Sequence, residues 1–146
     1  MKSRENAQAM LQRAAIILEE AKNLRAKGVW NLVVRRCQEA VELALKAALV
    51  SVGVQPPRVH DVGPTLKEHS ERFHDEFRKH IPQLASISRA LRAERELSFY
   101  GDEESGSPPE ALYSPEDAEE AIKKAEFVLE KCQALVAGGD GYAGCD

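Results

Sequence analysis

One stretch, Trp30–Val52, is apolar around more of its circumference than a surface helix needs to be. A first stripe at helical spacing contains Leu32, Val33, Cys37, Ala40, Val41, Ala44, Leu45, Ala48 and Val52. Further sides carry Leu43, Ala47 and Val50. Because a surface helix needs only one apolar stripe, this pattern predicts a central helix with others packed around it. Gly53 ends this helix, and Pro56-Pro57 prevents a restart.

Two more long helices are predicted to pack against the central one. Ser3–Lys27 keeps one apolar face over about six turns, and Gly28 ends it close to the central helix. A connection this short makes the two helices antiparallel neighbours. The last helix starts after Ser114, which is expected to cap it, with Pro115 in the first position.

Two shorter helices are predicted between the central and the last helix. Asp61 or Gly63 is expected to cap the first of them, with Pro64 at its start. Its apolar anchors are Leu66, Phe73 and Phe77. The second is expected to run as one helix from the region of Pro82 to near Tyr100-Gly101. Its buried face contains Ile81, Leu84, Ile87, Leu91 and Ser98.

These elements predict an all-α fold, an up-and-down bundle of four to five helices. The chain of 146 residues is of ordinary size for one domain. We expect residues 1–137 to form that domain and residues 138–146, which are rich in glycine, to form a flexible tail. Cys145 lies in this tail and is expected to be exposed.

Composition and charge exclude several classes of function. The formal net charge of −4 gives no general attraction to nucleic acid or to an anionic membrane, although a local basic patch stays open. No window is long and apolar enough to span a membrane. The first ten residues lack the charged-then-apolar order of a signal peptide, so we expect a cytoplasmic protein.

The cysteines and histidines do not predict a metal site. The three cysteines form no CxxC pair, and Cys37 and Cys132 lie at apolar helical positions typical of buried side chains. His69, His74 and His80 are separated by five and six residues, and neither spacing places two imidazoles on one helix face. We therefore expect neither metal nor cofactor.

Several stretches together resemble one known family. They are RRCQEAVELALKA, which contains the EAxxLALKA run at Glu39–Ala47, then His60-Asp61, REL-SFYGD, and YSPEDAEEAIKKAEFVLE. Their order and spacing resemble the HEPN domain (higher eukaryotes and prokaryotes nucleotide-binding). The resemblance implies a helical bundle that forms a homodimer. It also implies a nucleotidyltransferase as partner in a two-component toxin–antitoxin-like system. In this family a histidine resembling His60 organises the loop by hydrogen bonds.

Active members of this family carry an Arg-x(4–6)-His motif that makes a metal-independent ribonuclease. A histidine can move protons near neutral pH, and an arginine stabilises extra charge on a phosphate. Arg95 matches the arginine, but the window after it holds Tyr100, Gly101 and Asp102 and no histidine. Tyrosine is a poor base at pH 7, and aspartic acid is a poor proton donor there.

Three functions follow from this incomplete motif. The first is a non-catalytic HEPN homodimer that binds the nucleotidyltransferase partner and also a nucleotide or RNA. It would hold the phosphate of this ligand through Arg89, Arg92 and Arg95, which are spaced three apart on one predicted helix. The second is an endoribonuclease toxin that uses Arg95 with Tyr100 or Asp102, or with a histidine from elsewhere in the fold. The third is an interaction domain without a ligand, in which the arginines only pair with Glu94 or Glu96 at the surface.

Overall fold

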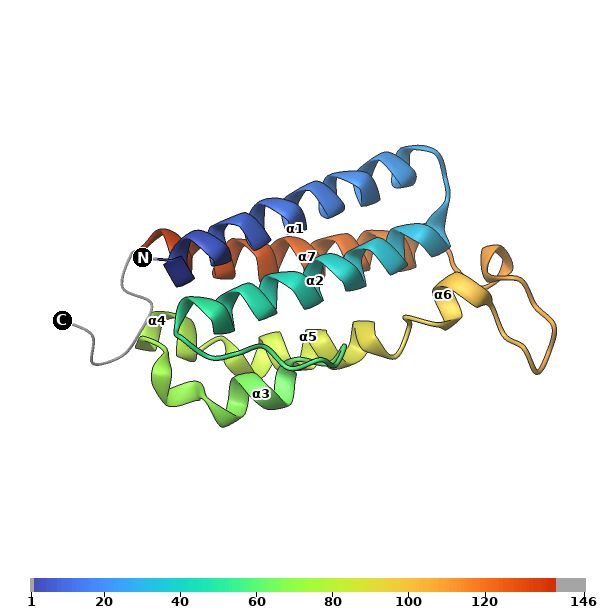
Figure 1. Cartoon of the computed structure of the whole chain (residues 1–146). Coiled ribbons are helices and arrows are strands. Elements are labelled where there is room, and N and C mark those ends of the chain that lie inside the picture. The colour runs from blue at the N-terminus through green and yellow to red at the C-terminus, as the bar shows by residue number, and fades with distance from the viewer. Residues whose placement is uncertain (1, 139–146) are drawn as a thin grey trace.

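The long helices of this chain lie side by side in a bundle (Figure 1). The computed structural model describes residues 2–138. The helices are α1 (Lys2–Ala26), α2 (Trp30–Ser51), α3 (Gly63–Glu68), α4 (Asp75–Arg78), α5 (Ile81–Arg92), α6 (Leu97–Tyr100) and α7 (Pro115–Ala137), with 3₁₀ turns η1 (Ser70–Arg72) and η2 (Pro109–Ala111). These described residues contain no β-strand, so the all-α prediction is confirmed. None of the helices described combines the length and the hydropathy of a membrane span.

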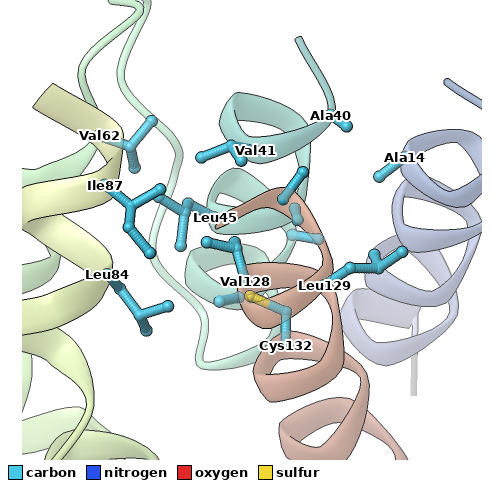
Figure 2. Close-up of a cluster of buried hydrophobic side chains, with 14 of the residues drawn as sticks. Ala14, Ala40, Val41, Leu45, Val62, Leu84, Ile87, Val128, Leu129 and Cys132 are labelled. Atoms are coloured by element: carbon cyan, nitrogen blue, oxygen red, sulfur yellow. The ribbon is translucent and has the colours of Figure 1, made fainter. Parts of the chain in front are cut away.

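The prediction of a central second helix is confirmed. All 22 residues of α2 are buried or half-buried. In Figure 2, Val41 and Leu45 point toward Ile87 of α5, Val128 of α7 lies beside Leu45, and Leu129 of α7 points toward Ala14 of α1. Helix α2 packs against α1, α5, α6 and α7. It therefore carries the core that the remaining helices share.

Two further predictions are confirmed, the antiparallel arrangement of α1 and α2 and the start of α7 at Ser114. α1 and α2 run antiparallel along each other (Figure 1). At the start of α7, the Ser114 hydroxyl accepts a hydrogen bond from the Asp117 N–H at 3.2 Å. The Asp117 carboxylate in turn accepts from the Ser114 N–H at 2.9 Å. This reciprocal capping box fixes the first turn of α7.

The prediction of one continuous helix anchored by Leu66, Phe73 and Phe77 is wrong. α3, η1 and α4 replace it, although all three anchors are buried. Phe73 has an extended backbone, which interrupts the helical path and lets its ring pack 4.8 Å from that of Phe77. Val62 is the N-cap residue of α3, and the Asp61 carboxylate accepts a hydrogen bond from the Gly63 N–H at 3.1 Å.

The helix predicted to reach Tyr100-Gly101 ends at Arg92 instead. A turn over residues 93–96 follows it, and then the single turn of α6. Two side chains of α2 bind backbone carbonyls where the helix is interrupted. Arg35 Nη1 donates to the Arg95 carbonyl at 2.8 Å, and Asn31 Nδ2 donates to the Ser98 carbonyl at 3.0 Å. These tertiary hydrogen bonds replace those that a continued helix would make.

Gly101 closes α6 in a conformation that favours glycine. Its φ is +80°, and a Cβ placed there would lie 2.4 Å from the Ser107 carbonyl oxygen. The chain then turns back, with the Asp102 N–H donating to that same oxygen at 3.0 Å. The loop after α6, which contains Asp102, Glu103 and Glu104, is thus closed by a hydrogen bond between residues 102 and 107.

The two buried cysteines are confirmed as core residues. Cys37 and Cys132 are both fully buried. Burial raises the pKa of Cys37 to about 12 and also raises the pKa of Cys132. Neither thiol is therefore a nucleophile at neutral pH. Cys145 and the predicted tail, apart from the helix-ending Gly138, lie outside the described residues.

We predict that Leu45→Ala lowers the free energy of unfolding by about 2–5 kcal/mol, because it opens a cavity in the shared core. Equilibrium urea denaturation followed by circular dichroism measures the change. Ile16→Ala is the control, since Ile16 on α1 is 59% exposed and its truncation costs about 0.5 kcal/mol or less. A loss at Leu45 no larger than that at Ile16 would contradict the central position of α2.

We predict that Ser114→Ala lowers the free energy of unfolding by about 1 kcal/mol, because the N-terminal capping box of α7 is lost. Ser114→Asp serves as the control, since aspartate is an equally good cap and is expected to retain most of the stability. Thermal or urea unfolding of the three proteins gives the comparison, and equal stability of Ser114→Ala and the wild type would refute it.

Candidate functional site

The polar edge of α2 faces two segments that are distant in sequence. Its members Arg35, Gln38, Glu39, Glu42 and Lys46 recur at helical spacing along one edge of α2. Arg95, from the turn after α5, and His60, from the loop after α2, complete the group. We call these seven residues the Arg95 cluster.

Glu42 lies at the centre of the Arg95 cluster. Its Oε1 atom is 2.9 Å from His60 Nδ1 and accepts a hydrogen bond from the Gln38 amide at 3.0 Å. Its Oε2 atom accepts a hydrogen bond from Lys46 Nζ at 2.9 Å. Burial by itself raises the pKa of Glu42, but the hydrogen bonds from Lys46, Gln38 and His60 outweigh it and hold that pKa below its ordinary value. Glu42 is therefore ionised at neutral pH.

Arg95 is held in place by its backbone and by its side chain. Its carbonyl accepts the hydrogen bond from Arg35, and its Nη1 donates to Gln38 Oε1 at 2.7 Å. The same Nη1 lies 4.0 Å from Glu42 Oε1, a longer approach than an ordinary hydrogen bond. The hydrogen bond to Gln38 fixes the guanidinium, and the Arg95 side chain is 20% exposed and lines an open hollow.

The other arginines of this region are already paired with carboxylates. Glu39 accepts from Arg35 Nε at 3.0 Å and from Arg36 Nη1 at 2.8 Å. The Arg35 guanidinium also lies 4.7 Å from the centre of the Phe99 ring, a cation–π contact. Because Lys46 pairs with Glu42, Arg95 has the weakest carboxylate contact among the cations of the cluster.

A shallow hollow opens beside Arg95. It has a volume of about 260 Å³ and is lined by Glu39, Glu42, Leu43, Lys46 and Arg95. Pockets that hold a whole small ligand are larger, about 300–1,000 Å³. The hollow therefore has room for a group such as a phosphate, with the rest of a larger ligand outside it.

The three arginines predicted to form one basic strip are separated by the structure. α5 ends at Arg92, so Arg95 lies beyond the helix and turns toward α2. Arg92 pairs with Glu96 at 2.8 Å on the surface, and Arg89 is exposed in the last turn of α5. The prediction that all three lie on one helix is wrong, and only Arg95 belongs to the cluster.

Tyr100 and Asp102, the residues predicted as alternative partners of Arg95, have other contacts. The Tyr100 side chain is 65% exposed, and its ring packs edge-on against Phe99 at 4.9 Å. The Asp102 carboxylate accepts hydrogen bonds from the Glu104 N–H at 3.1 Å and the Ser105 hydroxyl at 2.9 Å. Within residues 2–138, neither forms a hydrogen bond or ion pair with Arg95.

The sequence analysis missed the partners that α2 supplies to Arg95. Gln38, Glu42 and Lys46 follow one another at intervals of four residues, a signal of one polar edge on an otherwise apolar helix. His60, predicted to organise the loop through hydrogen bonds, contacts Glu42 of α2 through its Nδ1 atom. The sequence spacing did not indicate which carboxylate His60 contacts.

A second hollow brings together two of the histidines considered for a metal site. It has a volume of about 510 Å³ between α4 and the end of α7, and His74, His80 and Lys131 are among its lining residues. His69 does not line it. Across residues 2–138, no three histidine, cysteine or acidic side chains gather closely enough to hold a metal ion.

Comparisons with known proteins identify the family. The crystal structure of TT1696 from Thermus thermophilus matches with a TM-score of 0.71 and 20% identity, over 87% of this chain and 95% of that one. The crystal structure of ST0689, an archaeal HEPN homologue, matches with a TM-score of 0.69 and 22% identity, over 89% of this chain and 97% of that one. No curated protein sequence gives a match. The sequence model of the HEPN domain matches residues 7–135, and the chain therefore belongs to the HEPN domain family.

Proposed function

We propose that this chain acts as a cytoplasmic HEPN homodimer that binds a phosphate of a nucleotide or of RNA at the Arg95 cluster. Its partner protein is proposed to be a nucleotidyltransferase in a two-component toxin–antitoxin-like system, as the family resemblance implies. The observation that carries the phosphate site is the fixed, partly exposed Arg95 guanidinium at the edge of a hollow of phosphate size.

The charges of the Arg95 cluster support an anionic ligand. Glu39 is shared by two arginines, and Glu42 accepts hydrogen bonds from three neighbours. Arg95 uses its Nη1 on the neutral Gln38, which leaves other N–H groups of its guanidinium for a ligand. The planar guanidinium matches two phosphate oxygens at once, so a bound phosphate replaces the long contact to Glu42 with short charge-assisted hydrogen bonds.

The surface beside the Arg95 cluster supports a homodimer. Phe99 and Tyr100 on α6 are 42% and 65% exposed, and Phe99 contacts Arg35 of the cluster. Adjacent exposed aromatic side chains are typical of protein–protein contacts. The hollow at Arg95 is too small for a whole nucleotide. In this proposal, a second protomer seated on α6 supplies further walls for the ligand.

The motif residues favour binding over catalysis. Tyr100 points its ring against Phe99, and Asp102 uses its carboxylate within its own turn. A catalytic base must come within hydrogen-bond reach of the proton that it removes. Arg95 with Tyr100 and Asp102 is therefore a weaker basis for an endoribonuclease than for a phosphate-binding site.

We predict that Arg95→Ala weakens the binding of ATP or of a short single-stranded RNA at least tenfold. Isothermal titration calorimetry and fluorescence anisotropy measure the two ligands. Arg89→Ala is the matched control, since Arg89 is exposed on α5 outside the cluster and its loss is expected to change affinity less than twofold. Absence of binding by the wild type, or equal effects of the two variants, would contradict a phosphate site at Arg95.

We predict a mass in solution of twice the 16.1 kDa chain, measured by light scattering at micromolar concentration. Tyr100→Asp is expected to shift the mass toward the monomer, because it places a charge in the proposed apolar contact. Ile16→Asp provides the comparison, since Ile16 is similarly exposed, at 59% against 65% for Tyr100, but lies on α1. A wild-type monomer would exclude the homodimer, and a dimer lost through Ile16→Asp alone would move its contact to α1.

A further inference from the structure

We propose that the hollow between α4 and the end of α7 binds a small organic carboxylate with an apolar body. This site is separate from the Arg95 cluster, because no residue of that cluster lines it. Its volume of about 510 Å³ is roughly twice that of the hollow beside Arg95. It falls within the range of pockets that hold a whole small ligand, about 300–1,000 Å³. The inference therefore adds a second class of ligand at a second place on the molecule.

Part of the lining of this hollow is apolar. Phe77 and Leu135 line it, and both are buried members of the hydrophobic core. The Phe77 ring packs 4.8 Å from that of Phe73, which holds it in place. Ala134, exposed on α7, adds a small side chain and leaves the space open. Because the removal of apolar surface from water is favourable, an apolar ligand body that covers this lining is stabilised there.

The polar groups of the hollow gather around one aromatic ring. The His80 ring meets the Phe127 ring edge-on, with ring centres 5.8 Å apart, and Lys131 Nζ lies 5.3 Å from the centre of the same Phe127 ring. His80 and Lys131 both line the hollow, one from the start of α5 and the other from α7. Phe127 thus brings an imidazole and an ammonium group into the same part of the hollow. Few convergent polar groups on an apolar lining are typical of small-molecule sites.

The charges at the hollow favour a ligand with a single negative charge. Within residues 2–138, Lys131 has its cation–π contact to Phe127 and no ion pair. The acidic residue of the lining, Glu76, pairs with Lys79 at 2.9 Å, and its side chain is 86% exposed, so solvent screens its charge. A carboxylate carries the one negative charge that Lys131 complements. A phosphate monoester carries nearly two at neutral pH, which this lining does not match.

His80 makes the binding dependent on pH. Desolvation lowers the pKa of His80, and the positive charges of Lys131 and Lys79 lower it further, against the negative charges of Glu76 and Glu130. The ring is therefore neutral at pH 8. A bound carboxylate favours the imidazolium, so the pKa of His80 is higher in the complex than in the free protein. Binding then takes up protons, and the affinity rises as the pH falls from 8 to 6.

The test titrates the full chain at pH 6 with naphthalene-2-carboxylate, a rigid aromatic carboxylate, and follows backbone amide resonances by NMR. We expect saturable binding that shifts the resonances of Phe77 and Leu135. Naphthalene-2-methanol has the same rings without the charge and is expected to bind about fivefold more weakly or less. Equal affinity for the two compounds would overturn an anionic ligand, and absence of saturable carboxylate binding would overturn the site.

Variants on α7 locate the ligand. Lys131→Met removes the ammonium group and keeps a long side chain, so we expect about fivefold weaker carboxylate binding and unchanged binding of the alcohol. Ala134→Trp fills the hollow from an exposed position, so the fold is retained and both compounds lose affinity. Lys123→Met, an exposed lysine on the same helix outside the hollow, is the matched control with wild-type affinity. Equal losses for the two lysine variants, or full binding by Ala134→Trp, would overturn the site.

The pH dependence and the phosphate site are tested separately. We expect carboxylate affinity about threefold higher at pH 6 than at pH 8, and we expect His80→Gln to remove this difference. A difference that His80→Gln retains would overturn the role of His80. Arg95→Ala is expected to bind the carboxylate as the wild type does, so loss of the proposed phosphate site leaves this result unchanged. Displacement of the carboxylate by ATP would assign the hollow to a phosphate ligand and overturn the inference.

Discussion

The burial of α2 on nearly all sides is the constraint on which the other elements depend. Its apolar sides take up α1, α5 and α7, and they leave one edge for polar residues. That edge is itself half-buried, so each of its charged and amide groups has to find a partner inside the molecule. The Arg95 cluster is the result, since Arg95 and His60 add partners to Gln38 and Glu42, which also bond to each other and to Lys46. The burial of α2 therefore accounts both for the packing of the core and for the grouping of the candidate site residues.

The long helices could be predicted because their signals are local. Helical spacing of apolar residues defines α1 and α2, and the Ser114 cap with Pro115 defines the start of α7. The shorter elements could not be predicted in the same way. The break between α5 and α6 depends on donors from Arg35 and Asn31, which lie some sixty residues earlier in the chain. No pattern within residues 81–100 reports on such partners.

In the candidate site, too, some features follow from local sequence signals and others depend on tertiary contacts. The motif that resembles the HEPN family identified Arg95, and the structure places this residue at a hollow. Its neighbours come from α2 and from the loop after it, so their meeting depends on tertiary structure. A basic strip of Arg89, Arg92 and Arg95 was inferred from spacing on one helix, and this inference failed because the helix ends before Arg95. The position of His60 beside Glu42 required the path of the whole loop.

Arg35 joins two surfaces that a ligand and a partner would use separately. Its guanidinium donates to the Arg95 carbonyl and lies against the Phe99 ring. A protein that displaces Phe99 on docking removes one of the supports of this guanidinium, and the turn that carries Arg95 then loses part of its restraint. Under the proposed function, a partner on the aromatic surface and a phosphate at Arg95 are therefore expected to influence each other's binding, and such a linkage is reciprocal. Arg35, in the second turn of α2, is the residue that contacts both the turn carrying Arg95 and the exposed aromatic side chain Phe99.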